Sequence, residues 1–133
     1  QGIVGLAHAG WRGTIKKIGE KVINKMKESF NSDTKDCWIG IGPAISKKNY
    51  EIDKKLVNKF KQEFPFWNKI IECNHDKFYI DLKLCNKLLF ESIGIPFSQI
   101  ILSSLCTYQD KKHFYSFRRD EGITGRMGAI ITF

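Results

Sequence analysis

The chain has 133 residues, of which 42% are hydrophobic and 27% charged, the ordinary balance of a globular domain. No apolar run approaches the roughly 18 residues of a membrane span, and the first residues do not resemble a secretory signal. Its four cysteines form no CxxC pair, which favours reduced thiols over a disulfide framework. These features exclude a membrane protein and a disulfide scaffold, and we expect a cytoplasmic enzyme or binding module.

The net charge of +8 comes mainly from 18 lysines, which are spread along the chain as on a solvated surface. A basic module that binds nucleic acid is an alternative, but the aromatic residues sit at apolar positions rather than between lysines. The four arginines instead cluster in two short Gly-containing segments, as Arg12, Arg118, Arg119 and Arg126. Because only Arg offers a rigid bidentate fork, these positions indicate recognition of phosphate or carboxylate.

Residues 1–7 have the pattern of a buried strand. A protein rarely begins inside its own central strand, so we expect this chain to be a fragment of a longer domain. HAGWRGT follows at residues 8–14, and apolar residues at helical spacing then predict a helix over residues 15–30. Thr14 is its expected N-cap.

The middle of the chain predicts a strand over residues 37–41, which ends at a Gly-Pro turn. A helix is expected at 53–64, capped by Asp53, and a short strand at 78–80. Asp81 is expected to cap a third helix, which Gly94 and the proline after it bring to an end.

Three further strands are expected towards the end of the chain, at residues 100–105, 113–119 and 127–133. Strands and helices alternate at first, and strands dominate the end. This order predicts an α/β (α+β) fold, with a layered mixed sheet and packed helices.

The first segment with chemical potential is HAGWRGT. His8 is expected between a strand and a helix, where α/β proteins place their sites. Gly10 and Gly13 permit close backbone approach to a ligand, and the helix amides at Thr14, with Arg12 beside them, favour an anion. The alternative is a structural histidine with a satisfied hydrogen bond in a tight turn.

The second segment runs from Cys106 to Arg126. Three arginines within nine residues, Arg118, Arg119 and Arg126, suggest a clamp for an anion. An ion pair between Arg119 and Asp120 explains part of the pattern equally well. Cys106 is either a nucleophile or, as is commoner, a small core residue.

The two other histidines, His75 and His113, lie in polar stretches without metal-ligand spacing. We expect both on the surface.

The motifs HAGWRGT, GPAI with a following YEI, FYIDL with Asn86, CTY, and YSFRRD with TGR occur in this order along nearly the whole chain. In this combination the chain resembles the YfiH/laccase-domain family. The resemblance implies a layered α/β fold related to the catalytic domains of cytotoxic necrotizing factors. It also implies that residues 1–133 form the C-terminal part of a single domain.

The family has been assigned purine nucleoside phosphorylase, adenosine deaminase and methylthioadenosine phosphorylase activities, and some members are called peptidoglycan editing factors. The resemblance implies a metal site of two histidines and one cysteine, in which His8 is one ligand and the others lie upstream. We therefore expect Zn²⁺ at His8, with a purine nucleoside and phosphate as substrates. Arg12, with Arg118 or Arg126, is our candidate for holding the phosphate.

Two other enzyme classes are alternatives. The editing name suggests a hydrolase of peptidoglycan precursors. A copper-dependent phenol oxidase, which the older family name implies, is less favoured because the chain lacks the dense histidine clusters of such sites.

Overall fold

The computed structural model describes residues 2–132 of the chain. It confirms the mixed α/β class, and no helix among these residues is long and apolar enough to cross a membrane. The helices are α1 (Trp11–Ile15), α2 (Ile18–Phe30), α3 (Lys54–Glu63), α4 (Trp67–Ile70) and α5 (Leu82–Ser92). The strands are β1 (Ile39–Ile41), β2 (Glu51–Ile52), β3 (Ile71–Asn74), β4 (Lys77–Ile80) and β5 (Ile100–Leu102).

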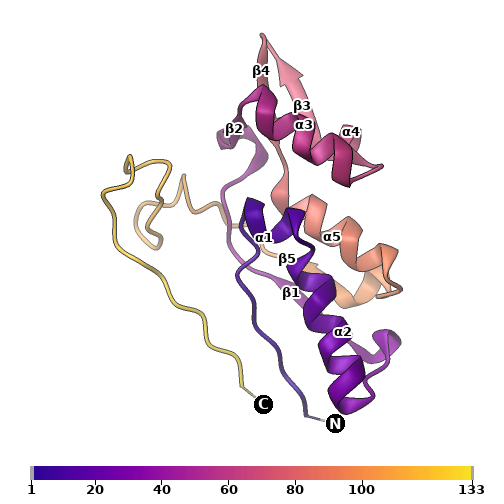
Figure 1. Ribbon diagram of the computed structural model, residues 1–133. Coiled ribbons are helices and arrows are strands. Elements are labelled where there is room, and N and C mark those ends of the chain that lie inside the picture. Colours follow the sequence, from indigo (N-terminus) through magenta and orange to yellow (C-terminus); the bar gives the residue numbers. More distant parts are fainter. Residues whose placement is uncertain (1, 133) are drawn as a thin grey trace.

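The strands form two small sheets at different levels of the molecule (Figure 1). β1 and β5 pair in parallel, with Gly40 opposite Ile101, and an isolated parallel bridge between Ala44 and Cys106 continues the same pairing. The second sheet is antiparallel in the order β2-β4-β3. The bridge between Ala44 and Cys106 brings the chain segments around GPAI and CTY side by side.

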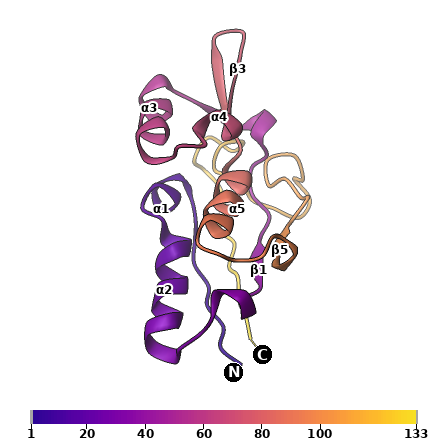
Figure 2. The same ribbon diagram turned by 90° about the vertical axis from the view of Figure 1, so that its right-hand side faces the viewer.

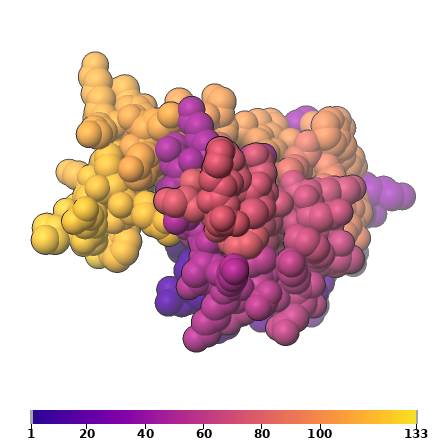
Figure 3. Space-filling model, turned by 90° about the horizontal axis from the view of Figure 1, so that it is seen from above, coloured from indigo at the N-terminus to yellow at the C-terminus, as the bar shows by residue number. Residues whose placement is uncertain are grey.

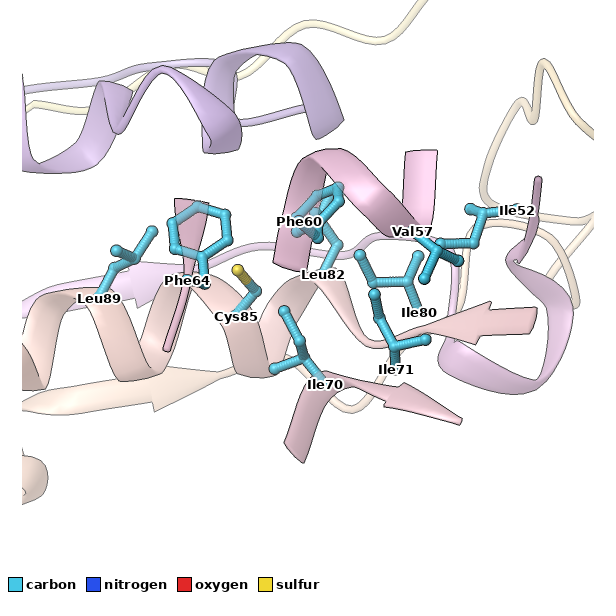
Figure 4. Packing of buried hydrophobic residues seen from close by; sticks show 10 residues of the cluster. All are labelled: Ile52, Val57, Phe60, Phe64, Ile70, Ile71, Ile80, Leu82, Cys85 and Leu89. Carbon is cyan, nitrogen blue, oxygen red and sulfur yellow. The ribbon is translucent and has the colours of Figure 1, made fainter. Parts of the chain in front are cut away.

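Helix α5 lies in the middle of the fold and contributes to two hydrophobic clusters. Leu82, Cys85 and Leu89 pack against residues of α3, α4, β3 and β4 (Figure 4). Phe90 and Ile93, at the end of the helix, contact the cluster formed with α2 and the parallel strands. The helix therefore joins the upper antiparallel layer to the lower parallel layer, as Figure 2 shows from the side.

Two predicted caps are confirmed. The Asp53 carboxylate accepts a hydrogen bond from the Leu56 amide at 2.7 Å, and Asp81 accepts one from the Leu84 amide at 2.9 Å. Each aspartate satisfies an amide that the first turn of its helix would leave unpaired. Both helices accordingly begin one residue after the capping aspartate.

The predicted single helix after HAGWRGT is wrong in its start, because the structure divides it into α1 and α2. Lys17 lies between them with φ 55°, in the left-handed region. Gly10 precedes α1 at the N-cap, and Thr14 is buried inside α1 instead of capping a helix. The Thr14 hydroxyl is hydrogen-bonded to the Ala9 carbonyl and the Asn86 side-chain amide, and it does not cap a helix.

The predicted strands at the two ends are also wrong for the described residues. Residues 2–7 and 127–132 are extended but join no strand within the described part of the chain, and residues 1 and 133 lie outside it. Both segments are mostly exposed rather than buried. A strand needs a neighbouring backbone to satisfy its amides and carbonyls, and no described strand pairs with residues 2–7 or 127–131.

The predicted strand at 113–119 is replaced by turns. The guanidinium of Arg119 donates to the carbonyls of Thr107, Tyr108 and Phe114 at 2.9–3.2 Å. These bonds gather the backbone around one side chain, which competes with an extended strand. The segment after residue 105 consequently forms an irregular lobe on one side of the molecule (Figure 3).

Sequence patterns did not predict β3 or its hairpin with β4. The turn residues His75 and Asp76 both have positive φ, at 46° and 61°. Positive φ at both central positions is typical of the two-residue turns that match the twist of antiparallel strands. His75 is exposed at the tip of this hairpin, and His113 is exposed elsewhere, as predicted.

Candidate functional site

A buried chain of hydrogen bonds fixes the HAGWRGT segment to α5. The Thr14 side chain is completely buried, and its hydroxyl donates to the carbonyl of Ala9 at 3.1 Å. The same oxygen accepts from the Asn86 side-chain amide at 3.0 Å, and that amide also donates to the Leu82 carbonyl at 2.8 Å. Because buried polar groups are costly when unpaired, these bonds define one conformation for the segment.

His8 lies exposed at the start of this segment and folds back over it. Its Nε2 atom is 2.8 Å from the point that a Cβ on Gly10 would occupy. Its carbonyl oxygen is 3.0 Å from the corresponding point on Gly13. The two glycines therefore serve the close approach of His8 to its own segment, and a side chain at Gly10 would displace the imidazole.

Three of the sequence motifs meet around one cavity of about 700 Å³. Trp11 comes from HAGWRGT, Tyr50 from the segment after GPAI, and Arg118 from YSFRRD. The Arg118 guanidinium donates to the Glu51 carbonyl at 2.8 Å, which joins the last two motifs. Residues that are far apart in the sequence thus line a single cavity.

Two cations that line this cavity, Lys59 and Arg118, contact its aromatic rings, and so does Arg12, which lies beside the cavity without lining it. The guanidinium carbon of Arg12 lies 4.4 Å from the centre of the Trp11 ring, and Lys59 Nζ lies 5.5 Å from it. Arg118 lies 5.3 Å from the centre of the Tyr50 ring. Such contacts within about 6 Å are attractive and orient the charged groups without neutralising them.

The carboxylates at the cavity are already engaged. Glu51 pairs with Lys77 at 3.0 Å, and Asp53 caps α3. Among the described residues, Lys55 and the three cations named above form no ion pair. The cavity therefore carries surplus positive charge and suits an anionic ligand.

The charges of the two predicted arginines, Arg12 and Arg118, both act on the Tyr50 hydroxyl. Burial raises the pKa of the Tyr50 hydroxyl above its ordinary value, while the charges of Arg118 and Arg12 act to lower it. Both arginines are therefore close enough to Tyr50 to influence its titration. Arg12 and Arg118 are 106 positions apart in the sequence, and each lies on an aromatic ring that lines the same cavity.

Arg119 and Arg126 have other surroundings. Arg119 forms a bidentate pair with Asp120, at 2.7 and 3.0 Å, and this pair with the Thr124 hydroxyl lowers the pKa of Asp120 to about 2. The ion pair between Arg119 and Asp120, which the sequence offered as the alternative to ligand binding, is therefore observed. Among the described residues, Arg126 donates to the adjacent carbonyls of Thr124 and Gly125, and it differs from Arg12 in contacting neither aromatic ring of the cavity.

Cys106 is buried where GPAI and CTY meet. Its sulfur lies 3.3 Å from the Ser46 amide, 3.2 Å from the Ser46 hydroxyl and 3.5 Å from the Asn49 side-chain amide. Desolvation alone would raise the pKa of this thiol, but hydrogen bonds from Ser46 and from the Gln109 and Tyr108 amides lower it to about 7. The thiol accepts from the Ser46 backbone amide and the Asn49 side-chain amide and donates to the Ser46 hydroxyl, so this buried residue joins two loops.

The described residues do not complete a metal site. No three side chains among His, Cys, Asp and Glu are grouped closely enough in this part of the chain to hold an ion. His8 is exposed and can offer its imidazole as a single ligand. A complete site at His8 would therefore need ligands from outside residues 2–132.

Sequence reasoning missed the aromatic platform of the site. Trp11 and Tyr50 stood inside quoted motifs, but nothing in their spacing indicated that their rings would support cations. Lys59 lies on the exposed face of α3 among other lysines and carries no distinguishing signal. Its approach to Trp11 depends on the packing of α3 beside α1.

The family model described as "Multi-copper polyphenol oxidoreductase laccase" matches residues 1–133, so the chain belongs to this family. It is 37% identical over 131 residues to a Bacillus subtilis protein named "Purine nucleoside phosphorylase YlmD", covering 97% of this chain and 47% of that protein. The crystal structure of YlmD from Geobacillus stearothermophilus matches with a TM-score of 0.82 and 33% identity, over 90% of this chain and 45% of that one. A Bacillus licheniformis protein, YfiH, matches with a TM-score of 0.81 and 33% identity, over 87% and 44% of the two chains.

The chain therefore spans about half the length of the curated relatives it matches. These comparisons show the family and the fold of the chain.

The hydrogen bonds of Thr14 give a direct prediction. Thr14→Val removes the hydroxyl and leaves the Ala9 carbonyl and one Asn86 N–H unpaired, at a cost of about 1–3 kcal/mol in the free energy of unfolding. Thr14→Ser keeps the hydroxyl and loses one methyl group, worth about 1 kcal/mol. Urea denaturation measures both. Equal stability of the valine variant and the wild type would contradict the role given to this hydroxyl.

Proposed function

We propose that this chain provides the phosphate-binding part of a purine nucleoside phosphorylase. The observation that carries the proposal is the cavity beside HAGWRGT, which Lys59 and Arg118 line and beside which Arg12 lies on the Trp11 ring. Among the described residues, these three cations have no carboxylate partner. Among the relatives, the Bacillus subtilis protein named "Purine nucleoside phosphorylase YlmD" supports the proposal. Phosphate is an anion that arginine recognises with paired hydrogen bonds.

In phosphorolysis a phosphate oxygen attacks the ribose carbon of the glycosidic bond. A new carbon–oxygen bond forms, the carbon–nitrogen bond breaks, and the purine leaves with the electron pair and then takes up a proton. Arg12 and Arg118 would hold the phosphate and offset its charge as it approaches the ribose. Fixed cations of this kind act most strongly where water is excluded.

The methylthioadenosine phosphorylase activity belongs to the same proposal, because it needs the same phosphate. Adenosine deaminase activity requires water in place of phosphate, so the cationic cavity gives it no support. A reaction that removes the purine amino group at an unchanged rate without phosphate would identify deamination as a separate activity.

The arginines give the main test, best made in a chimera that joins this chain to the unmatched half of the Bacillus subtilis relative. Arg12→Gln and Arg118→Gln are expected to raise the phosphate KM for inosine phosphorolysis about 10-fold or more, as for a lost charged hydrogen bond. Arg126→Gln is the matched control and should change it less than about 2-fold. An unchanged phosphate KM in Arg12→Gln would remove Arg12 from the site.

We further propose that His8 contributes one ligand to Zn²⁺, and that the part of the relatives not spanned by this chain supplies the others. Elemental analysis of the chimera and of its His8→Ala variant tests this. The expected result is about one zinc per chain, lost in the variant. Zinc that persists without His8, or copper in its place, would contradict the proposal.

A further inference from the structure

Two cysteines of this chain are buried, and their sulfur atoms have opposite surroundings. Cys85 lies in α5 inside the hydrophobic cluster, where burial, aided by the charge of Asp81, raises the pKa of its thiol to about 12. At Cys106 burial acts in the same direction, but hydrogen bonds to the sulfur prevail and lower the pKa of the thiol to about 7. Cys106 therefore differs from a small core residue of the Cys85 kind, because polar groups of the chain are directed at its sulfur.

The groups that bind the Cys106 sulfur lead directly to the cavity. The Ser46 amide and the Asn49 side-chain amide donate to the sulfur at 3.3 and 3.5 Å. Asn49 directly precedes Tyr50, whose ring lines the cavity. The Tyr50 amide is bonded to the same turn, because it donates to the Lys47 carbonyl at 3.0 Å. The position of the Tyr50 ring therefore depends on the turn that Cys106 holds.

A second path from Cys106 reaches the cavity through Arg118. Thr107 follows Cys106, and its carbonyl accepts from the Arg119 guanidinium at 2.9 Å. Arg118 is the neighbour of Arg119, and its guanidinium carbon lies 5.3 Å from the centre of the Tyr50 ring. Cys106 thus lies where the segment that carries Tyr50 is joined to the segment that carries Arg118.

We propose that Cys106 is a positioning residue of the anion site and that it acts through Arg118. By joining the two segments, it keeps the Arg118 guanidinium on the Tyr50 ring and thereby sets the affinity of the cavity for phosphate. The effect on affinity rests on the proposed function, whereas the placement of Arg118 does not. Arg12 lies on the Trp11 ring in another segment, so Cys106 should not influence its placement.

The test compares Cys106→Ala with Cys106→Ser and with Cys85→Ala, the matched control, in the 133-residue chain. Alanine removes the sulfur and its hydrogen bonds, serine restores a group that donates and accepts, and Cys85→Ala removes the same atom from another buried position. The NMR signals of the Arg118 δ-methylene protons, which the ring current of Tyr50 displaces, report the placement of Arg118 without ligand. Titration with inorganic phosphate then gives the dissociation constant.

In Cys106→Ala the Arg118 signals should move to the position of an arginine away from a ring. The dissociation constant for phosphate should rise about 5-fold or more, as for a weakened charged hydrogen bond. Cys106→Ser and Cys85→Ala should keep the Arg118 signals and change the constant less than about 2-fold, although Cys85→Ala also lowers the stability. The signals of Arg12 should stay in place in all three variants.

Asn49→Ala is the second variant, and it decides the question if Cys106→Ala loses its circular dichroism signal. It removes one donor to the sulfur from a half-buried position and should displace the Arg118 signals in the same direction. The Tyr50 carbonyl accepts from the Ile80 amide at 3.1 Å in addition to these contacts, which should keep the strand after Tyr50 in place.

Unchanged Arg118 signals in Cys106→Ala and Asn49→Ala would overturn the proposal. So would an equal displacement in Cys85→Ala, or displaced Arg118 signals with an unchanged dissociation constant for phosphate. A wild-type chain that does not bind phosphate would overturn the proposed function and the effect on affinity with it, while the Arg118 signals would still decide the positioning.

Discussion

The hydrogen bonds of the buried Thr14 hydroxyl are the constraint on which the site depends. They join Ala9 in the HAGWRGT segment to Asn86 in α5, the helix that also links the two sheets of the fold. Thr14 is buried within α1, which ends at Ile15, and Lys17 turns the chain in the left-handed region before α2 begins. Trp11 is thereby directed towards α3 and the cavity, while His8 remains exposed at the start of the segment.

The positive charge of the cavity arises because its carboxylates have partners, whereas among the described residues its cations form no ion pair. Its acidic residues are engaged with Lys77 and with the cap of α3. Its cations Lys59 and Arg118 lie on the Trp11 and Tyr50 rings, and Arg12 lies on Trp11 beside the cavity. Rings hold a cation in place without cancelling its charge, as a carboxylate would. A lysine-rich surface is common, whereas arginines held on aromatic rings beside a cavity of about 700 Å³ are the feature on which the proposed anion site rests.

Local signals allowed much of this fold to be predicted. Asp53 and Asp81 were predicted as caps because capping depends on a few adjacent residues and on apolar spacing after them. Arg12 and Arg118 were predicted as anion-binding residues because arginine is scarce among the lysines of this chain. Their proximity in space was not predictable from local sequence, because it depends on long-range packing. Tyr50, whose ring contacts Arg118, was not singled out.

The failures have physical causes that a single segment does not reveal. Thr14 fits the pattern of an N-cap, yet its partner is Asn86, 72 residues away. The segment 113–119 alternates like a strand, but Arg119 gathers three carbonyls around its guanidinium. Residues 2–7 and 127–131 have strand-like sequences, but a strand also requires a partner strand, and none of the described strands pairs with them.

The central claim is that the segment fixed by Thr14 and Asn86 brings Arg12 and Arg118 to one anion site. The most direct measurement is the NMR signal of each arginine Nε–Hε group during titration of this chain with inorganic phosphate. The account predicts that the Arg12 and Arg118 signals shift together with one dissociation constant, while Arg126 does not respond. Shifts of Arg12 and Arg118 at clearly different phosphate concentrations, or a response of Arg126 alone, would contradict it.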